Sequence, residues 1–492
     1  MIDLIALVDR LSGKSLVLDQ QGNFERVYID HLTNDSRRVG PEGLFIAIKG
    51  ELADGHLFIE KAVQNGAIAI VCEAMPAEVQ KHFPGIAFVQ VNNARTALAE
   101  LAAAFYGDPA KQLRMIGVTG TNGKTTTAFL VHHMLTELHV KAGLISTVEY
   151  RIGNRKEEAT HTTPDILDTC RLLRQMVDAG CKACIMEVSS HALIQDRVRT
   201  IPYEVGVFTN LSQDHLDYHG TMAEYLRAKK ILFDNLGPDA HAVYNQDDES
   251  GEQMVEDTQA AKIAYGSRET PALKGEVKEN SLEGLLLEID GMVCRFKLVG
   301  HFNAYNLLAA YGVGIALGYD RNKVLEALQT ADPVPGRFEI LAVSKGRYVI
   351  VDYAHTPDAL ENVLKTALAT KPAAAALWCL FGCGGDRDAK KRPMMGRIAE
   401  HFSDFVVATS DNPRTEDPNA ILEDIRAGIS EPDEVCWIVD RKEAIQYMAD
   451  KSEAGDVILI AGKGHEPYQV IGKEKFDFDD RIEALAAFGL GK

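Results

Sequence analysis

A glycine-rich run between two apolar stretches is the feature of this sequence that most directly predicts chemistry. Residues 120–126 read Gly-Thr-Asn-Gly-Lys-Thr-Thr, after the apolar residues 115–118 and before a helical pattern that runs to Leu138. A glycine loop between a strand and a helix points backbone N–H groups at a phosphate, and the helix N-terminus adds positive potential. In such a loop Lys124 reaches the β- and γ-phosphates, and the Thr125 hydroxyl holds Mg²⁺. We therefore expect a nucleoside triphosphate as the first ligand.

The spacing of this run departs from the usual phosphate loop. The usual pattern has a glycine five positions before the second glycine, where this chain has Val118, and the first glycine stands at Gly120 instead. The alternative is a chance Gly-Lys-Thr turn at a helix start. The strand and helix patterns on either side favour the phosphate loop.

Three residues further along could act beside this loop. Glu187 ends an apolar run, where a carboxylate suits Mg²⁺, which prefers oxygen ligands. The alternative is a solvated acid at a strand end, and the upstream loop favours the metal role. His215 is the best candidate ligand in the polar run 210–220, although that run could also be a turn with capping acids. Lys229 lies in a helical pattern and by itself would be a surface lysine.

Charged residues late in the chain could recognise an amino acid. Arg387 and Arg414 each follow a predicted strand, and a guanidinium matches a carboxylate in bidentate fashion. Each arginine alone could equally form a surface salt bridge. Glu466, shortly after Gly462, adds a carboxylate that could bind an ammonium. Together these groups suit a substrate that carries charges of both signs.

The elements that must position these groups fall into three blocks, 1–107, 108–335 and 336–492. Strand-like runs in the first block lie at 44–48 and 67–71. Apolar strands in the second block lie at 115–118, 183–188, 205–209 and 242–245. Those in the third block lie at 348–352, 377–381, 405–409 and 457–461. Strands that alternate with helical patterns predict an α/β fold with mainly parallel, buried sheets. Because ligands bind beyond the carboxyl ends of such strands, we expect a site along that edge of the third block.

Composition limits the classes of function. The chain has 492 residues, 46% of them hydrophobic, and a formal net charge of −19, which argues against nucleic-acid binding. An anionic small substrate remains compatible, since Mg²⁺ and a few arginines can set the local field. Eight cysteines are scattered, and the lone pair Cys181 and Cys184 lacks a second pair at zinc-site spacing. We find no signal peptide and no apolar run long enough to span a bilayer, and expect a cytoplasmic protein.

The ordered signatures of this chain resemble those of the Mur ligases, ATP-dependent amide-forming enzymes of peptidoglycan precursor synthesis. The signatures lie at 120–126, 187–191, 210–220, 300–306, 336–339 and 352–357. They extend over nearly the whole chain, and the departure of the phosphate loop from the strict pattern is itself typical of the family. The resemblance implies an N-terminal domain that binds a UDP-linked substrate, a central P-loop-type ATPase domain and a C-terminal Rossmann-like domain that binds the amino acid.

Within the family, the chain is similar to the members that add the third residue of the stem peptide. The stretches that carry this likeness are 35–37, 162–165, 384–388, 411–414 and 461–466. The Asp-Asn-Pro-Arg version of 411–414 resembles members that add meso-diaminopimelate, whereas L-lysine-adding members usually have another residue where Arg414 stands. Diaminopimelate is lysine with a distal carboxylate, and Arg414 offers that carboxylate a partner.

The resemblance also implies a reaction and a role for each matching residue. The γ-carboxylate of UDP-N-acetylmuramoyl-L-alanyl-D-glutamate attacks ATP to form an acyl phosphate, and the diaminopimelate amine then displaces phosphate. The nucleotide-binding positions are Gly120, Thr121, Asn122, Gly123, Lys124, Thr125, Thr126, Asn303, Arg337 and Asp352. The positions for the UDP-linked substrate are Ser36, Thr162, Thr163, Ser189, Gln195 and Arg197. The amino-acid positions are Arg387, Asp411, Asn412, Pro413, Arg414, Gly462 and Glu466.

The resemblance implies metal and catalytic roles as well. Thr125 and Glu187 match the positions that hold one Mg²⁺, and His215 matches the histidine at a second Mg²⁺. Lys229 aligns with the lysine that these enzymes carbamylate with CO₂, which turns an ammonium into an anionic oxygen ligand. The catalytic residues are then Lys124, Lys229 and His215.

Three alternatives stay open. An L-lysine-adding member differs only in the amino acid. A folylpolyglutamate synthetase shares the glycine loop but gives no reason for an N-terminal sugar-nucleotide domain. A nucleotide-binding regulator without ligase activity would need no amino-acid pocket. For the diaminopimelate-adding member we expect a monomer whose partners are the UDP-muramoyl dipeptide, meso-diaminopimelate and ATP, with neither nucleic acid nor membrane among them.

Overall fold

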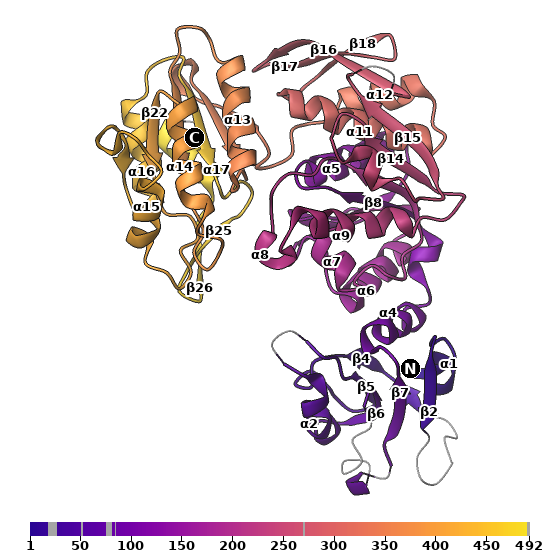
Figure 1. The fold of residues 1–492 in the computed structure, drawn as a ribbon. Coiled ribbons are helices and arrows are strands. Elements are labelled where there is room, and N and C mark those ends of the chain that lie inside the picture. Colours follow the sequence, from indigo (N-terminus) through magenta and orange to yellow (C-terminus); the bar gives the residue numbers. More distant parts are fainter. Residues whose placement is uncertain (18–26, 51–52, 75–80, 84, 269–270, 490–492) are drawn as a thin grey trace. The chain divides into compact units, whose positions relative to one another are not determined.

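The chain folds into two compact units in this computed structural model (Figure 1). The structure describes residues 1–17, 27–50, 53–74, 81–83, 85–268 and 271–489. The first unit comprises Met1–Gly117, Val140–Glu204 and Asn235–Ala240. The second unit comprises Val118–His139, Val205–Asp234 and His241–Lys492. Strands β8 (Arg114–Thr119) and β13 (Tyr203–Phe208) each contribute residues to both units.

The N-terminal part of the first unit is built on a five-stranded sheet. Its strand order is β2 (Lys14–Val17), β7 (Ala87–Val91), β6 (Ala67–Cys72), β5 (Gly43–Ile46) and β4 (His31–Thr33). All neighbours are parallel except β2 and β7. The other elements here are β1 (Ile2–Asp3), α1 (Leu4–Val8), β3 (Tyr28–Ile29), η1 (Gly55–Phe58), α2 (Ile59–Gln64), α4 (Ala94–Phe105) and η2 (Pro109–Gln112). The strand-like runs predicted at 44–48 and 67–71 are thus strands.

The rest of the first unit supplies four strands in the order β11 (Arg155–Glu158), β10 (Glu149–Ile152), β9 (Ala142–Ile145) and β12 (Ala183–Glu187). Only β9 and β12 are parallel, and helices α6 (Ile166–Asp178) and α7 (Ser190–Ile194) flank β12 in sequence. Asp165 begins α6 by accepting a hydrogen bond from the Asp168 N–H, and Ser189 begins α7 by accepting one from Ala192. These caps fix where each helix starts after its loop.

In the second unit, β13, β14 (His241–Asn245), β15 (Ala261–Gly266) and β16 (Leu273–Ser281) run parallel in that order. Strands β17 (Gly284–Ile289) and β18 (Met292–Phe296) then continue from β16 as an antiparallel meander. The sequence of the meander alternates buried and exposed residues, as expected of a sheet with one covered face. The helices of this part are α5 (Lys124–Glu137), α8 (Leu216–His219), α9 (Met222–Asp234), α10 (Gly251–Met254), α11 (His301–Ala316) and α12 (Arg321–Gln329).

The C-terminal part of the second unit contains a six-stranded sheet. Its order is β19 (Glu339–Ala342), β20 (Tyr348–Asp352), β24 (Val457–Ala461), β21 (Leu377–Phe381), β22 (Phe405–Ala408) and β23 (Cys436–Trp437). Only β19 is antiparallel to its neighbour. The other elements are η3 (Ser344–Gly346), α13 (Pro357–Thr370), α14 (Lys391–Phe402), α15 (Pro418–Arg426), η4 (Pro432–Glu434), α16 (Arg441–Lys451), β25 (Tyr468–Ile471), β26 (Glu474–Asp477) and α17 (Asp480–Phe488).

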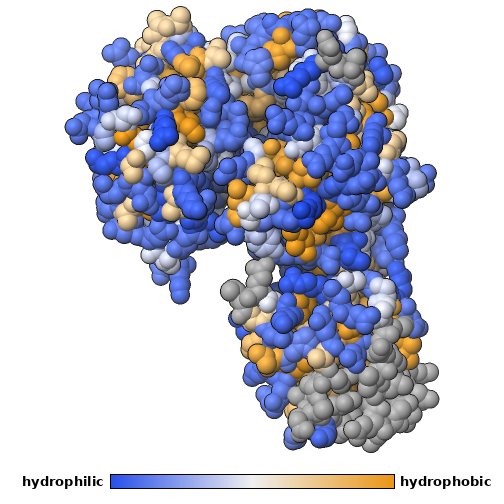
Figure 2. Space-filling view, in the orientation of Figure 1, coloured by the Kyte–Doolittle hydropathy of each residue, from blue (hydrophilic) through white to orange (hydrophobic). Residues whose placement is uncertain are grey.

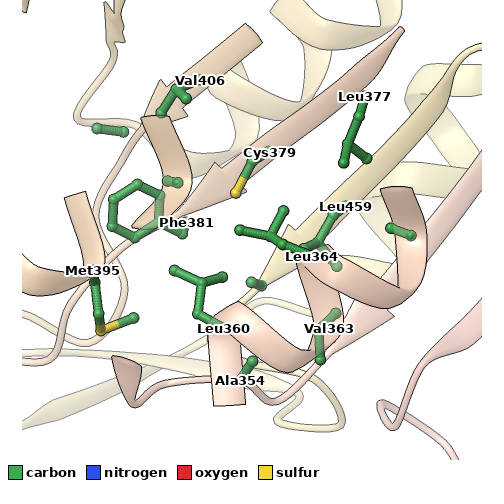
Figure 3. Packing of buried hydrophobic residues seen from close by; sticks show 14 of the residues in the cluster. Ala354, Leu360, Val363, Leu364, Leu377, Cys379, Phe381, Met395, Val406 and Leu459 are labelled. Atoms are coloured by element: carbon green, nitrogen blue, oxygen red, sulfur yellow. The ribbon is translucent and has the colours of Figure 1, made fainter. Parts of the chain in front are cut away.

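Helices cover both faces of this sheet (Figure 1). On one face Leu360 and Leu364 of α13 and Met395 of α14 pack against Cys379 and Leu459 of the sheet (Figure 3). On the other face the residues that pack together come from α16, α17 and the strands: Val349, Val351, Trp378, Leu380, Val407, Ala444, Ile445, Met448, Ile458, Ile460, Ala484 and Phe488. A strand buried on both faces reads as a continuous apolar run, which is why β20, β21 and β24 could be predicted to the residue.

Hydrophilic residues predominate on the face of the molecule in Figure 2, interrupted by small groups of hydrophobic residues. Among the described residues, no helix has the length and apolar character that crossing a bilayer would require.

Candidate active site

The glycine loop of the second unit has a backbone that only glycine adopts without strain at two positions. Gly120, directly after β8, has φ +148°, and Gly123, directly before α5, has φ +82°. A side chain at Gly120 would collide with the Thr209 hydroxyl, and one at Gly123 would collide with the Asn306 amide oxygen. The strand, loop and helix predicted around residues 120–126 are therefore present.

Residues after β13 hold the shape of this loop. Asn210 accepts a hydrogen bond from the Thr121 N–H at its backbone oxygen (2.8 Å) and from the Asn122 N–H at its side-chain oxygen (2.9 Å). The Thr209 hydroxyl donates to the Asn122 carbonyl (2.6 Å). The 210–220 signature thus braces the loop through Asn210, a role that the sequence interpretation did not assign.

Two lysines converge on one carbonyl of the loop. The Lys124 ammonium donates to the Gly120 carbonyl at 2.9 Å, and Lys229 Nζ donates to the same oxygen at 2.8 Å. Lys229 is 1% exposed and lies 4.4 Å from the centre of the Tyr225 ring. Burial, and then the nearby Lys124 charge, hold the pKa of Lys229 well below the ordinary lysine value. An uncharged amine at Lys229 relieves the repulsion between the two side chains.

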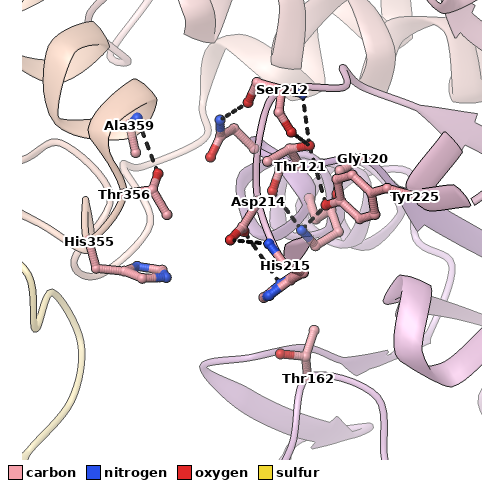
Figure 4. Close-up of polar contacts among 12 residues, drawn as sticks. Gly120, Thr121, Thr162, Ser212, Asp214, His215, Tyr225, His355, Thr356 and Ala359 are labelled. Atoms are coloured by element: carbon pink, nitrogen blue, oxygen red, sulfur yellow. Dashed lines mark hydrogen bonds and ion pairs between the residues drawn. The ribbon is translucent and has the colours of Figure 1, made fainter. Parts of the chain in front are cut away.

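His215 is close enough to both lysines for their charges to act on it, and it lies near Asp214 and Tyr225 (Figure 4). It has a left-handed backbone, with φ +53°, and its N–H donates to the Asp214 carboxylate at 2.8 Å. Burial lowers the pKa of His215, against the opposing effect of Asp214. Burial would raise the pKa of Asp214, but His215 and His355 together with Lys124 lower it. The loop therefore presents a carboxylate and a neutral imidazole near the two lysines.

The C-terminal sheet region reaches the nucleotide loop through two side chains. Arg337 Nη2 lies 3.4 Å from Thr125 Oγ1, and its guanidinium stacks 4.5 Å from the Tyr353 ring centre. Asp358 Oδ2 accepts hydrogen bonds from Asn122 Nδ2 and Ser212 Oγ, each at 2.8 Å. Asp358 stands in the first turn of α13, which begins where Thr356 accepts a hydrogen bond from the Ala359 N–H (Figure 4). Sequence interpretation assigned Arg337 to the nucleotide site, which remains a prediction, and it did not name Asp358.

The Asp352 carboxylate holds the backbone next to Arg337 in place. Its carboxylate accepts hydrogen bonds from the Phe338 and Ala354 N–H groups at 2.6 and 2.7 Å, and burial raises its pKa against the effect of Arg337. Both oxygens thus bind the backbone, and one of the two N–H groups directly follows Arg337. Its predicted contact with the nucleotide remains a prediction.

Asn303 links α11 to the loop region through Asn306. Asn303 Oδ1 accepts a hydrogen bond from Asn306 Nδ2 at 2.9 Å, and Asn306 Oδ1 lies 3.3 Å from the Thr127 hydroxyl that donates to it. Both asparagines are buried. The predicted position Asn303 therefore acts on α5 through Asn306, which was not assigned a role. Thr126 is also buried, in the first turn of α5.

The first unit brings most of the predicted UDP-substrate residues together. Thr163 Oγ1 donates to the Glu187 carbonyl (2.8 Å) and lies 3.3 Å from Ser189 Oγ, while Arg197 donates to the Thr163 carbonyl (3.0 Å). The Gln195 side-chain oxygen accepts two hydrogen bonds from Arg197. These residues lie at the carboxyl end of β12, as expected for a ligand site in an α/β sheet.

Thr147 ties Glu187 to Thr162 in the same unit. Its N–H and hydroxyl donate to the Glu187 carboxylate at 2.8 and 3.1 Å, and its hydroxyl oxygen lies 3.1 Å from that of Thr162. Glu187 is fully buried. Ser36 lies apart from this cluster in the N-terminal sheet region, where its carbonyl accepts a hydrogen bond from Asn65.

The amino-acid positions gather at the carboxyl ends of β21, β22 and β24. Gly462 has φ +116°, and a Cβ there would lie 2.7 Å from the Asp411 carboxylate. Asn412 Nδ2 donates to Glu466 Oε2 at 2.9 Å, and Arg414 Nη1 donates to the Gly385 carbonyl at 2.8 Å. Arg387 is exposed. A Cβ at Gly385 would collide with the Pro413 carbonyl, so glycine is required for the two loops to approach.

Arg414 has a left-handed backbone, with φ +52°. Its N–H donates to the Val470 carbonyl and its own carbonyl accepts from the Gly472 N–H, which holds this conformation in place. Asp386 in the neighbouring loop has φ +53°. Non-glycine residues with a left-handed backbone are strained, and such residues occur most often at functional sites.

Within the described ranges, no group of three or more His, Cys, Asp or Glu side chains is placed to hold a metal ion. Of the predicted magnesium ligands, Thr125, His215 and Lys229 belong to the second unit and Glu187 to the first. Their role as ligands therefore remains a prediction.

Three protein-family models match this chain, in the same order as the three predicted blocks. Residues 28–106 match the Mur ligase family catalytic domain, 118–314 the Mur ligase middle domain and 336–464 the Mur ligase glutamate ligase domain. A protein of Geobacillus thermodenitrificans named UDP-N-acetylmuramoyl-L-alanyl-D-glutamate--2,6-diaminopimelate ligase is 47% identical over 98% of this chain and 99% of its own. A protein of the same name from Cytophaga hutchinsonii is 46% identical over 91% of this chain and 92% of its own.

The chain belongs to the Mur ligase family. A solved structure entitled UDP-N-acetylmuramoyl-L-alanyl-D-glutamate--2,6-diaminopimelate ligase resembles this Mur ligase with a TM-score of 0.67 and 33% identity, and covers 96% of this chain and 99% of its own. The predicted family and the three-domain α/β architecture are confirmed. The predicted domain boundaries remain a prediction, although each family match lies within one of the three intervals.

Proposed function

We propose that this Mur ligase joins meso-2,6-diaminopimelate to UDP-N-acetylmuramoyl-L-alanyl-D-glutamate with consumption of ATP, in peptidoglycan precursor synthesis. The observation that carries the proposal is identity of up to 47% with diaminopimelate ligases over as much as 98% of the chain. The amino-acid positions around Arg414 and Glu466 support the choice of amino acid. The reaction needs ATP because a carboxylate is a poor electrophile, and phosphorylation gives it a leaving group.

The groups around Asn412 suit a substrate with both charges. Arg414, held by the Gly385 carbonyl and by its strained backbone, offers guanidinium donors to the distal carboxylate of diaminopimelate. Glu466 offers a carboxylate to an ammonium. L-Lysine lacks the distal carboxylate, so a lysine in this pocket would leave the guanidinium without its anionic partner.

The nucleotide loop supports ATP binding at the start of α5. Its N–H groups and the helix N-terminus favour phosphate, and the Lys124 ammonium, which now donates to two loop carbonyls, is placed to turn to the phosphates instead. Arg337, close to Thr125, adds a second positive charge beside the same helix start. These groups neutralise charge on the transferred phosphoryl group and orient it.

Magnesium and a carbamate fit the donors of this chain. The buried Lys229, with its lowered pKa, favours the uncharged amine that adds CO₂. The candidate Mg²⁺ ligands in the second unit are Thr125, His215 and Lys229 as its carbamate, and the candidate in the first unit is Glu187. Magnesium bound there would supply charge neutralisation on the phosphates.

The nucleotide-sugar peptide would bind to the first unit. Thr163, Ser189, Gln195 and Arg197 form one hydrogen-bonded cluster there, which Thr162 joins through Thr147 and Glu187, and Ser36 contributes from the N-terminal sheet region. We further propose domains at 1–107, 108–335 and 336–492, a cytoplasmic location and a monomeric state.

An amino-acid panel tests the proposed function. Purified enzyme receives ATP, Mg²⁺ and the UDP-muramoyl dipeptide, and phosphate release is measured with meso-diaminopimelate, L-lysine, D-lysine and L-glutamate. We expect meso-diaminopimelate to give the highest kcat/KM. A panel led by L-lysine would establish the lysine-adding alternative, and turnover with glutamate on a folate substrate would establish the folylpolyglutamate synthetase.

A further inference from the structure

Lys463 is a fully buried lysine that the site described so far does not use. It follows β24, between Gly462 and Gly464, and its relative exposure is 0%. The glycines on either side have φ values of +116° and +55°, which are backbone conformations that favour glycine. Lysine is almost never fully buried unless it is paired. The partners of Lys463 therefore indicate what it does.

Both hydrogen-bond partners of Lys463 belong to the amino-acid positions. Its Nζ donates to Asn412 Oδ1 at 3.1 Å and to Glu466 Oε2 at 3.2 Å. It also lies 5.7 Å from the centre of the Tyr468 ring. Because the side chain is inaccessible, Lys463 cannot touch a substrate, and its effect must pass through these partners.

The ammonium fixes the orientation of Asn412. Asn412 Oδ1 accepts hydrogen bonds from Lys463 and from the Val470 N–H (2.9 Å), so the amide nitrogen must face the other way. There it donates to Glu466 Oε2 at 2.9 Å. The three side chains thus form a closed triangle, and reversal of the amide would place a donor against the Lys463 ammonium.

The triangle also orients the Glu466 carboxylate. Both of its hydrogen bonds within the triangle end at Oε2, and the side chain is 16% exposed, which leaves Oε1 to face an incoming cation. Without Lys463, a largely buried carboxylate would keep only one neutral donor from this triangle, at a cost in desolvation.

We propose that Lys463 is a positioning residue for the substrate ammonium: it holds the Glu466 carboxylate turned so that Oε1 receives an ammonium of the incoming amino acid. This inference rests on the proposed function, since it assigns the cation at Glu466 to that amino acid. It predicts an effect on amino-acid affinity that is separate from nucleotide binding.

The test is the substitution Lys463→Met, with Lys475→Met as the matched control. Lys475 lies 3.9 Å from the centre of the Tyr468 ring, which Lys463 also approaches. Lys475 is exposed, however, and takes no part in the triangle. For Lys463→Met we expect the KM for meso-diaminopimelate to rise at least tenfold, with the KM for ATP within twofold of the unsubstituted enzyme. Lys475→Met should leave both KM values within twofold.

A double-mutant cycle separates positioning from a general structural role. If Lys463 acts through Glu466, then Lys463→Met should raise the amino-acid KM less than threefold in a Glu466→Gln background, because the neutral amide needs no compensating charge. Lys463→Gln, which keeps side-chain donors, provides a second variant if Lys463→Met does not fold, and we expect it to raise the same KM at least threefold.

Each outcome decides a different question. An unchanged KM for diaminopimelate in a folded Lys463 variant, or an equal rise in the KM for ATP, would overturn the inference. The same would follow if the effect of Lys463→Met persisted fully in the Glu466→Gln background. Failure of the unsubstituted enzyme to use diaminopimelate would overturn the proposed function instead.

Discussion

At the scale of single residues, charge placement around the nucleotide loop governs the chemistry that this Mur ligase can perform. Lys124 and Lys229 donate to one carbonyl, but Lys229 is buried whereas Lys124 is only half-buried. Burial of Lys229 favours the uncharged amine. An uncharged Lys229 thus reduces the positive charge beside Lys124, and it also supplies the amine for the proposed reaction with CO₂.

The pKa of Lys229 leads to a pH-dependent prediction. Carbamate formation needs the uncharged amine, which predominates above the pKa of Lys229 in the folded protein, a value well below 10.5. At constant dissolved CO₂, carbamate occupancy should fall as the pH drops through that pKa, and it should persist to a lower pH than a carbamate on an exposed lysine. Carbon-13 NMR with labelled bicarbonate measures the carbamate signal. A signal of equal size in Lys229→Met would refute the assignment.

The substitution Arg414→Ala tests recognition of the distal carboxylate. Loss of a charge-assisted hydrogen-bonding partner costs about 2–3 kcal/mol, so kcat/KM for meso-diaminopimelate should fall roughly 30- to 150-fold. The KM for ATP should stay within twofold. The matched control is Arg295→Ala, which removes an exposed arginine paired with Glu279 on the β16–β18 meander. Equal losses for diaminopimelate and lysine would show that Arg414 does not set specificity.

Sequence analysis named residues whose role is indicated by a local pattern. It missed residues whose partners lie far away along the chain. Lys124 and Thr125 are recognisable because the glycine loop surrounds them in sequence. The Asp358 carboxylate accepts a hydrogen bond from the Asn122 amide across 236 residues of chain, and no local pattern signals that pairing. Lys463 stood beside a candidate ligand, but only its burial distinguishes it from a surface lysine.

At the scale of elements, one buried ion pair ties together the strand ends that form the amino-acid positions. Arg441, at the start of α16, forms two hydrogen bonds of 2.7 Å with Asp480 of α17, and both side chains are fully buried. The same guanidinium donates to the Ala461 carbonyl (2.9 Å), at the end of β24 directly before Gly462. The pair therefore positions the loop that carries Glu466.

The substitution Asp480→Asn should destabilise the fold strongly. It leaves a buried guanidinium without its counter-charge, which typically costs about 3–5 kcal/mol of unfolding free energy. Urea denaturation followed by tryptophan fluorescence measures the loss. Glu483→Gln on the same helix is the control, because its partner Lys442 is exposed and such pairs contribute about 1 kcal/mol or less. Similar midpoints for the two variants would contradict the proposed role of the pair.

Elements could be predicted where burial leaves a simple pattern. The strands β20, β21 and β24 are continuous apolar runs, and their bounds agree with the prediction. The β16–β18 meander was missed because its strands alternate charged and apolar residues, with a register shift between Val277 and Glu279. Sequence analysis assigned no strands to this stretch, and its antiparallel strands extend the mainly parallel sheet of the second block.

At the scale of the whole molecule, three Mur ligase family models match successive parts of the chain. The order of the matches agrees with the order of the predicted blocks. What the sequence could not predict is the division into two compact units, since the central block contributes segments to both. Contacts between distant segments decide that division, and they depend on packing rather than on local pattern.

The proposed reaction predicts which substrates must be present before the enzyme releases ADP. ADP should form only when the UDP-muramoyl dipeptide and an amino acid are both present, because the acyl phosphate needs its acceptor for turnover. A coupled pyruvate kinase assay measures ADP with each substrate omitted in turn. Rapid ADP release without either substrate would indicate a simple ATPase, and no release under any condition would indicate a non-catalytic regulator.

The fate of the carboxylate oxygen tests the central claim most directly, namely that ATP activates an acid group for attack by an amine. UDP-muramoyl dipeptide labelled with oxygen-18 in the D-glutamyl γ-carboxylate is converted with ATP and meso-diaminopimelate, and the products are analysed by mass spectrometry. Activation as an acyl phosphate predicts that one labelled oxygen per turnover appears in inorganic phosphate and the other stays in the new amide. Label found in AMP, or phosphate free of label, would contradict the account.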